Sequence, residues 1–454
     1  MRDVDLLLTG GWVLPQERPG EALPNATVAI AGDRIVDVGP AADVAERVQA
    51  ARTIDCSGKA VLPGLVDCHV HTCQQLARGL ADDVGVLEWL TRIVAFEGVM
   101  DADDVYHSAR AACLEMIKSG TTAFIEGCAN PFYIDAAGQA MAESGIRAVL
   151  TRSTMEIQEP DWTVPDPFLM DGEANFEGTR QMIQRWNGAA DGRVAAWCGW
   201  RQQWNLTDEL LARIIRLARD CGVGLHGHLS TRRYGQIELL DRLGVLGPDL
   251  VFAHAIRYTA REIDLIAHYG VKIDHNPGAS MHGAYGSAPA GQYPEMLEKG
   301  VCVCLGCDGA ANGNTLDMFQ TMRLAATLHK EVRQDPTVIS AAQALQMGTV
   351  NGARACQWED VGVLAPGKKA DVIVVDLMQP HLLPLHDVTN NLVYCASGQD
   401  VVTTICDGKV LMEDRRVLVM DERRALAEAN ERAEQIAVRW REHLAARQAA
   451  PAAV

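Results

Sequence analysis

The middle of the chain repeats one pattern, a short apolar segment typical of a buried strand followed by an amphipathic helical segment. Two helices can be bounded directly. Thr259 and Glu262 form a capping box before a helix that ends at Gly270, and Thr207 begins a helix that runs to about Cys221. Eight such units predict an α/β fold, a closed (β/α)8 TIM-like barrel of parallel strands. The expected strands are 61–68, 121–126, 147–151, 194–200, 223–228, 251–254, 271–275 and 301–308.

The two ends of the chain have a different composition, with short strands separated by glycine-containing turns. The first 60 residues show no helical periodicity, and similar strand patterns return at 370–376 and 401–411. We therefore expect both ends to form one small β-sandwich domain. The predicted boundaries are 1–61 and 364–420 for this domain, 62–363 for the barrel, and 421–454 for a C-terminal helix and tail.

Charge and composition restrict the possible partners and compartment. The formal net charge of −18 disfavours nucleic acid, because phosphates would be repelled over most of the surface. We find no apolar run long enough to span a membrane and no apolar stretch typical of a secretory signal at the amino terminus. Thirteen cysteines, an odd number, fit reduced thiols. We expect a cytoplasmic protein that acts on a small molecule.

Polar residues recur where the predicted strands end, which is where this type of barrel places its active site. His69 and His71 are two apart at the end of the first strand, so both imidazoles face one side. Any one of these residues could be an ordinary core or loop residue, but together they indicate a metal centre. The other members of the set are His226 and His228, His254, Asp274 and His275, and Asp308.

These residues occur in segments that resemble the amidohydrolase superfamily, in the branch of triazine hydrolases, guanine deaminases and methylthioadenosine/adenosylhomocysteine deaminases. The segments are 63–71, 225–228, 252–254, 275–277, 306–317 and 366–371. The resemblance implies one divalent ion held by His69, His71, His228 and Asp308, with zinc favoured over Fe²⁺ or Mn²⁺. Residues 197–201, at the fourth strand, contain no lysine that could bridge a second ion. A homo-oligomer, a dimer or larger, is also implied.

The expected chemistry is hydrolysis by a metal-activated water. Asp308 would accept the proton of that water, and His254 would stabilise the oxyanion that develops. The substrate-binding residues that we expect are Gln74, Trp89, Thr231, His275 and Asn312. For Gln74 and Trp89 the alternative role is packing of a loop and helix over the site.

One departure from the family pattern affects the expected substrate. Thr231 stands where the family usually has a glutamate that protonates a ring nitrogen or a leaving group. A threonine cannot exchange a proton near neutral pH, so we expect an amide-like or urea-like carbonyl, such as an aryl urea or an anilide. The alternatives are an aminohydrolase or dechlorinase of a purine, pterin or s-triazine, with Glu126 or His275 as the acid, and an inactive homologue that serves as a binding protein.

Overall fold

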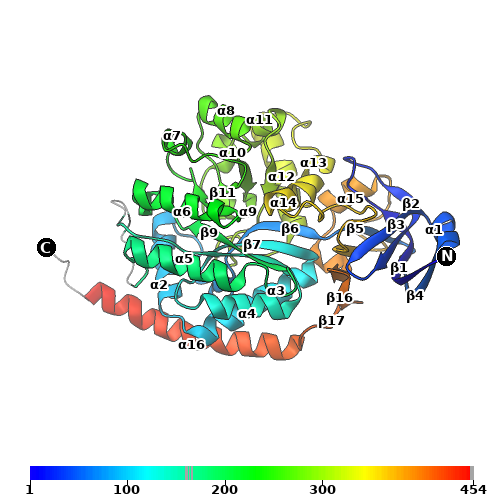
Figure 1. Cartoon of the computed structure of the whole chain (residues 1–454), viewed down its shortest axis with the longest axis horizontal. Helices are drawn as coiled ribbons and strands as arrows, with labels where there is room; N and C mark the ends of the chain where they lie inside the picture. The colour runs from blue at the N-terminus through cyan, green and yellow to red at the C-terminus, as the bar shows by residue number, and fades with distance from the viewer. Residues whose placement is uncertain (159–161, 163, 165–166, 450–454) are drawn as a thin grey trace.

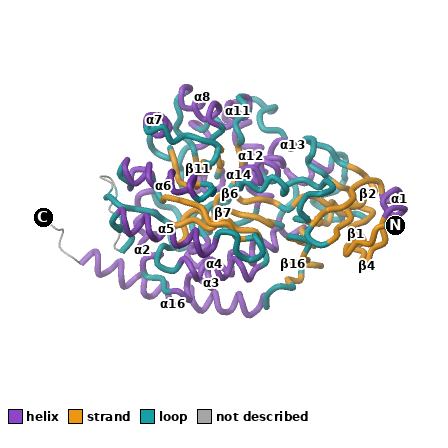
Figure 2. The backbone as a smooth tube through the Cα atoms, viewed as in Figure 1, coloured by secondary structure: helices purple, strands orange, loops and turns teal. Residues whose placement is uncertain are grey.

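The computed structural model describes residues 1–158, 162, 164 and 167–449. A barrel of strands surrounded by helices forms the larger part, and a sheet built from both chain ends lies beside it (Figures 1 and 2). Among the described residues, no helix is long and apolar enough to cross a membrane.

The eight predicted barrel strands are present, and all their pairings are parallel. One boundary was wrong, because the segment expected as a single strand at 61–68 is divided at Gly64. Its first part belongs to the end sheet and only its second part enters the barrel. The barrel strands are β6 (Leu65–Val70), β7 (Thr121–Ala129), β8 (Arg147–Arg152), β9 (Val194–Trp200), β10 (Leu225–Leu229), β11 (Leu250–His254), β12 (Lys272–His275) and β13 (Val303–Leu305).

The last and first barrel strands are joined at their carboxyl ends. The Asp308 amide donates to the His69 carbonyl oxygen at 2.7 Å, and the Cys307 amide donates to Asp67 Oδ1 at 3.0 Å. These bonds bring the segment after β13 against β6. Two residues expected to bind the same metal ion are therefore set side by side by the closure of the barrel.

The helices begin and end at the signals seen in the sequence. Thr259 and Glu262 form the predicted capping box of α8, which Gly270 ends with φ +67°, and Thr207 caps α6. The elements between the barrel strands and after them are η1 (Thr72–Ala77), α2 (Val86–Gly98), α3 (Ala102–Ser119), α4 (Ile134–Ser144), α5 (Gly172–Trp186), η2 (Gln203–Asn205), α6 (Asp208–Asp220), α7 (Gln236–Arg242), α8 (Ala260–Tyr269), α9 (Pro277–His282), α10 (Ser287–Ala290), α11 (Tyr293–Glu298), α12 (Met318–Arg333), α13 (Ala341–Met347) and α14 (Val350–Ala355).

The two chain ends do form one small β domain, as a single nine-stranded mixed sheet. Antiparallel pairing of β5 with β14 joins the ends, and Leu8, Val28, Val374 and Ile405 share its core. One helix, α1 (Ala41–Arg47), was not predicted from the sequence. Val44 is its one buried residue, so the segment shows no helical repeat of apolar residues. The strands are β1 (Arg2–Val13), β2 (Leu23–Ala31), β3 (Arg34–Pro40), β4 (Val48–Asp55), β5 (Lys59–Pro63), β14 (Val372–Asp376), β15 (Val401–Cys406), β16 (Lys409–Glu413) and β17 (Arg416–Val417).

The remaining elements follow β14, and the last of them lies along the outside of the barrel (Figure 1). They are α15 (Val388–Tyr394), η3 (Gly398–Asp400) and α16 (Glu422–Ala449). Arg439 of α16 pairs with the buried Asp104 at the start of α3, and the Trp440 indole donates to the Arg92 carbonyl oxygen of α2 at 2.9 Å. The C-terminal helix expected from its alternating charges thus packs on α2 and α3.

A buried ion pair connects the barrel to the end sheet. Arg147, at the start of β8, donates to Asp371 at 2.6 and 3.1 Å and to Asp407 at 2.5 Å. The side chains of Arg147 and Asp371 are 4% and 0% exposed. Such a pair is costly to break, because the remaining partner keeps a charge without water or a counter-ion.

We predict that Arg147→Ala lowers the free energy of unfolding by about 3–5 kcal/mol, because it leaves the Asp371 carboxylate buried without its partner. Urea denaturation measures this change. Arg185→Ala is the matched control, since Arg185 pairs with Asp135 in an exposed ion pair and should change stability little. An equal effect of the two substitutions would contradict the prediction.

Candidate active site

Four histidines and one aspartate meet at the carboxyl ends of the barrel strands. His69 lies in β6 and His71 directly follows it, His228 lies in β10 and His254 in β11, while Asp308 follows β13. All five side chains are buried. This is the set predicted from the sequence as metal ligands and catalytic residues, and the fold brings all of it together.

The geometry of this cluster fits a single metal ion. His71 Nε2 lies 3.2 Å from His228 Nε2 and 3.3 Å from Asp308 Oδ1, and His69 Nε2 lies 3.7 Å from Asp308 Oδ1. His69 Nε2 is buried without a hydrogen-bond partner among the described residues. Ligand atoms of His69, His71 and His228 lie within 4.8 Å of one another, as do those of His69, His254 and Asp308. Three imidazoles and a carboxylate are a suitable donor set for zinc and similar ions.

The environment keeps the imidazoles neutral, which is the form that binds a metal. Burial lowers the pKa of His69, His71 and His228 well below the ordinary value, and neighbouring cationic or imidazole groups lower it further. Burial also lowers the pKa of His254, although Asp308 opposes this effect. The pKa of Asp308 is raised by burial and drawn back by His254.

Groups behind the cluster orient the ligands. His226 Nε2 lies 2.8 Å from His69 Nδ1, so a proton on Nδ1 leaves His69 Nε2 free for a metal ion. Glu126 Oε1 lies 3.9 Å from His71 Nδ1, and the second Glu126 oxygen accepts from the amide and hydroxyl of Thr72. Gly127 of β7 leaves room for these rings, since a Cβ there would lie 2.5 Å from His69 Cε1.

Two members of the cluster have a left-handed backbone. The φ of His254 is +68° and that of Asp308 is +67°. This region costs a residue other than glycine on the order of 1–3 kcal/mol and persists only where the surroundings enforce it. His254 is the last residue of β11 and Asp308 lies three residues after the end of β13, so both stand at the carboxyl ends of barrel strands.

A small cavity of about 30 Å³ lies beside the cluster. Trp89 lines it, fixed by a 2.9 Å bond from its indole to the Ala311 carbonyl oxygen, and its contact with a substrate stays a prediction. Asn312 also lines it and donates to Asp308 Oδ2 and to the Tyr285 hydroxyl, both at 2.9 Å. Thr231 is a third predicted residue in this wall.

Sequence reasoning missed several wall residues, namely Val86, Leu90, Arg201, Gln202 and Tyr285. Arg201 directly follows β9, so its place at a strand end was a signal that could have found it. Its guanidinium pairs with Glu97, and both side chains are nearly inaccessible to water. Tyr285 comes from the segment between α9 and α10, and we found no sequence pattern that indicates its role.

Two predicted substrate contacts lie away from the cavity wall. Gln74 Nε2 donates to Glu97 Oε1 at 2.9 Å, so Gln74 supports the partner of Arg201. His275 stacks on Tyr293 with ring centroids 3.8 Å apart, and its Nε2 lies 3.2 Å from His329 Nε2. Neither residue belongs to the described lining of the cavity. Their direct contact with a substrate stays a prediction.

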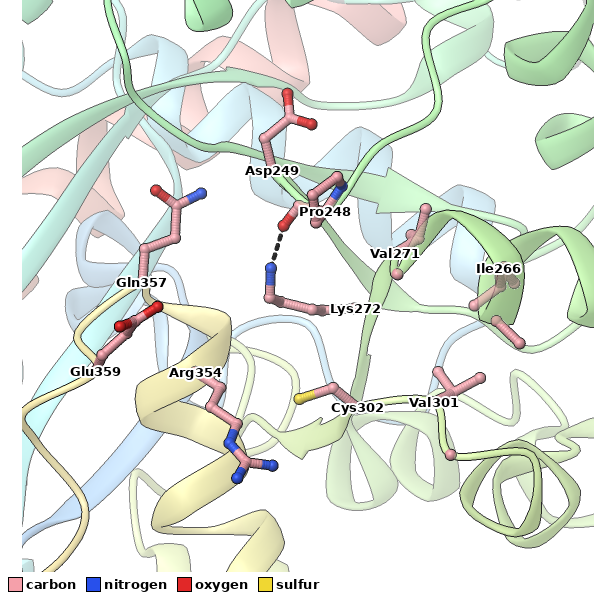
Figure 3. A pocket seen from close by; sticks show the side chains of 13 residues that line it. Pro248, Asp249, Ile266, Val271, Lys272, Val301, Cys302, Arg354, Gln357 and Glu359 are labelled. Atoms are coloured by element: carbon pink, nitrogen blue, oxygen red, sulfur yellow. Dashed lines mark hydrogen bonds between the residues drawn. The ribbon is translucent and has the colours of Figure 1, made fainter.

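A larger hollow lies at the opposite, amino-terminal ends of β11, β12 and β13, and Figure 3 shows it from close by. Lys272 donates there to the Pro248 carbonyl oxygen, and Arg354 and Glu359 lie around it. The metal-ligand clusters found among the described residues lie elsewhere, at the carboxyl ends of the strands. Barrels of this type carry their chemistry at that carboxyl end.

Comparison with known proteins agrees with this arrangement. The pattern of the Amidohydrolase family matches residues 60–411. The chain belongs to the amidohydrolase family. It is 39% identical over 447 residues to the 5'-deoxyadenosine deaminase of Methanosarcina mazei, covering 96% of this chain and 99% of the relative. It is 37% identical over 441 residues to the 5-methylthioadenosine/S-adenosylhomocysteine deaminase of Pelotomaculum thermopropionicum, covering 94% and 98%.

A solved structure shows the same architecture. The adenosine deaminase of Xanthomonas campestris, crystallised with bound zinc, superposes with a TM-score of 0.89 at 30% identity, covering 96% of this amidohydrolase and 99% of that chain. The expected superfamily, barrel and hydrolysis of a carbon–nitrogen bond are therefore confirmed. The relatives favour the aminohydrolase alternative over the aryl urea or anilide that we first expected from Thr231.

We predict that His69→Ala, His71→Ala, His228→Ala and Asp308→Ala each lose the metal ion and the activity, because three ligands no longer complete the tetrahedral set. Elemental analysis of the purified variants measures bound metal. His268→Ala, at the exposed end of α8, is the control and should keep full metal content. Normal metal content in a variant of the four would remove that residue from the ligand set.

We also predict a single rise of kcat/KM with increasing pH near neutrality. Burial raises the pKa of Glu126 to about 7, so its folded carboxyl is protonated below that pH and the anion beside His71 is lost. Asp308 must likewise be ionised to accept a proton. Glu126→Gln removes one of these two ionisations and should change the pH profile, because only the ionisation of Asp308 then remains. Identical profiles of wild type and variant, from about pH 5 to about pH 9, would show that Glu126 does not control the rate.

Proposed function

We propose that the chain is a zinc-dependent aminohydrolase that replaces the exocyclic amine of a purine nucleoside of the 5'-deoxyadenosine type with oxygen and releases ammonia. The observation that carries this proposal is the combination of the complete His₃Asp cluster with near full-length similarity to deaminases of adenosine derivatives. Zinc is proposed because the adenosine deaminase structure contains it and because three imidazoles and one carboxylate suit it.

The shape of the cavity supports a flat, partly apolar substrate. The cavity itself is small, about 30 Å³, well below the roughly 300–1,000 Å³ typical of small-molecule sites, so its lining and not its size supports this substrate. Val86, Trp89 and Leu90 of α2 form an apolar wall, and the bond to Ala311 holds the Trp89 indole in place. An indole held in this way can stack against a heterocycle.

Polar atoms on the wall offer contacts to such a ring. Thr231 Oγ1, Gln202 Oε1 and Asn312 Oδ1 are buried and have no hydrogen-bond partner among the described residues. Buried polar atoms usually have a partner, so these three are candidates to bind the substrate. The two amide oxygens can accept bonds from an amine, and the hydroxyl can donate to a ring nitrogen.

The proton transfers can be assigned to residues of this chain. A divalent ion bound by the cluster would make a water molecule more acidic. Asp308 accepts a proton from the attacking water and passes it to the departing amine, so that water and the amino compound become the oxo compound and ammonia. His254, neutral because burial lowers its pKa, donates a hydrogen bond to the group under attack.

Thr231 has a weaker role in this scheme than a carboxylic acid would have. Its hydroxyl donates a hydrogen bond to the ring nitrogen but keeps its proton, so the ring carbon is activated less. Thr231, at the position where the family usually has a glutamate, is also the observation that favours the second candidate, an amide-like or urea-like carbonyl. Such a carbonyl is already polarised and needs no protonation of a ring. Turnover of each class of compound distinguishes the two.

We predict ammonia release from 5'-deoxyadenosine, 5'-methylthioadenosine and S-adenosylhomocysteine, with slower reaction of guanine and an aminotriazine and none of an aryl urea or anilide. Ammonia and amine detection on purified, zinc-loaded enzyme measures this. Turnover of the aryl urea or anilide, with no ammonia from any heterocycle, would overturn the proposal in favour of the second candidate.

Substitutions of Thr231 test its hydroxyl. Thr231→Val keeps the shape but removes the donor, and should lower kcat for the best nucleoside about tenfold, the effect of about 1.4 kcal/mol. Thr231→Ser keeps the hydroxyl and is the matched control. Equal activity of the valine and serine variants would exclude a hydrogen bond from this residue in the reaction.

A further inference from the structure

We propose that Tyr293 and Asn276 are positioning residues that hold His254 in its left-handed conformation, with its ring toward Asp308 and the cavity. The inference rests on the role proposed above for His254 in the reaction. It assigns a function to a buried group of side chains, around His275, that the metal centre and the cavity wall do not use.

Both backbone polar groups of His254 are bound by side chains from later segments. Its amide donates to Asn276 Oδ1 at 3.0 Å, and its carbonyl oxygen accepts from the Tyr293 hydroxyl at 2.5 Å. Its φ is +68° and that of Ala255 is +55°, a conformation unfavourable for both residues. His254 is the last residue of β11, so the two side-chain bonds hold the backbone at the point where this strand ends.

Asn276 is itself fixed in one orientation. Its Nδ2 donates to Asp274 Oδ2 at 2.8 Å, which leaves Oδ1 facing the His254 amide. If the side-chain amide of Asn276 were reversed, its N–H would face the backbone N–H of His254. The segment after β12 thus presents an acceptor to the end of β11.

Tyr293 is held by stacking. Its ring lies 3.8 Å from that of His275, centroid to centroid, at an interplanar angle of 25°, and meets His329 edge-on at 5.3 Å. Tyr293 and His275 are both fully buried. The hydroxyl therefore has little freedom to leave the His254 carbonyl oxygen.

Hydrogen bonds fix the protonation of the two histidines behind Tyr293. Arg333 Nη1 lies 3.1 Å from His329 Nδ1. Because a guanidinium can only donate hydrogen bonds, His329 Nδ1 is the acceptor. Neutral His329 then carries its proton on Nε2 and donates to His275 Nε2 at 3.2 Å. Glu295 holds Arg333 by bonds of 3.0 and 2.8 Å. A continuous series of contacts thus runs from the partly exposed Glu295 to Tyr293.

This series supports position and does not move protons to the site. It ends where the Tyr293 hydroxyl donates to a backbone carbonyl oxygen, a group that cannot pass a proton on to the His254 ring. Tyr293 can therefore influence the reaction only through the conformation of His254.

The test is Tyr293→Phe, which keeps the stacked ring and removes the hydroxyl. We expect kcat to fall about tenfold with KM nearly unchanged, and no further fall when the substitution is added to His254→Ala. His254→Ala alone should lower kcat about a hundredfold. Tyr258→Phe is the control, because Tyr258 is a buried tyrosine that makes no hydrogen bond to His254 in the described structure. The proposal would be overturned if Tyr293→Phe left kcat unchanged, or if it lowered kcat equally in the wild type and in His254→Ala.

A second measurement needs no substrate and so separates this proposal from the proposed function. In a crystal structure of zinc-loaded Tyr293→Phe, His254 should leave the left-handed region and its Nε2 should move away from Asp308 Oδ2, 3.8 Å distant in the native arrangement. If His254 keeps its position there, the proposal fails whichever substrate the enzyme uses. If no heterocycle is deaminated while His254 moves as expected, only the proposed function fails.

Discussion

Crowding of four imidazole rings around one buried carboxylate is the constraint on which the rest of this structure depends. The centroid of His69 lies 4.6, 4.7 and 5.4 Å from those of His71, His228 and His254, so two charged rings could not be adjacent without water. Burial keeps the rings neutral, and their free nitrogens then face Asp308. The bond between the Asp308 amide and the His69 carbonyl oxygen closes the barrel at this same point. The contact that closes the barrel thus also brings two of the expected metal ligands together.

The surrounding residues divide into groups that orient the ligands and groups that meet a substrate. His226 is within hydrogen-bond distance of His69 Nδ1 and orients that ring, while Glu126 lies 3.9 Å from His71 Nδ1. The Arg201 and Glu97 pair forms a polar wall whose charges neutralise each other. Removing either partner would leave the other charge buried without a counter-ion. The cavity between these groups is small, and its free hydroxyl and amide oxygens suit a heterocycle that carries both donors and acceptors.

Thr231 changes how such a site can work. A carboxylic acid at this position could lend a proton to the ring, whereas a hydroxyl can only hold a hydrogen bond. In the proposed reaction, more then depends on Asp308, which would act on the attacking water, and on His254, which would act on the developing charge. This dependence gives the exact placement of His254 greater weight, and His254 is the residue whose backbone is bound at both ends by side chains.

The sequence by itself determined the barrel, the ligand set and the shared β domain, because strand and helix periodicity, caps such as Thr259, and polar residues at strand ends are local signals. It misjudged the strand at 61–68, since pairing partners that lie far along the chain decide where one sheet ends and another begins. It also indicated an amide-like substrate from Thr231 alone, whereas near full-length similarity to deaminases favours the aminohydrolase alternative. Only the tertiary structure decided that Arg201 and Tyr285 face the cavity and that His275 supports Tyr293. Those contacts join segments with no common periodicity, and packing alone selects which side chains meet.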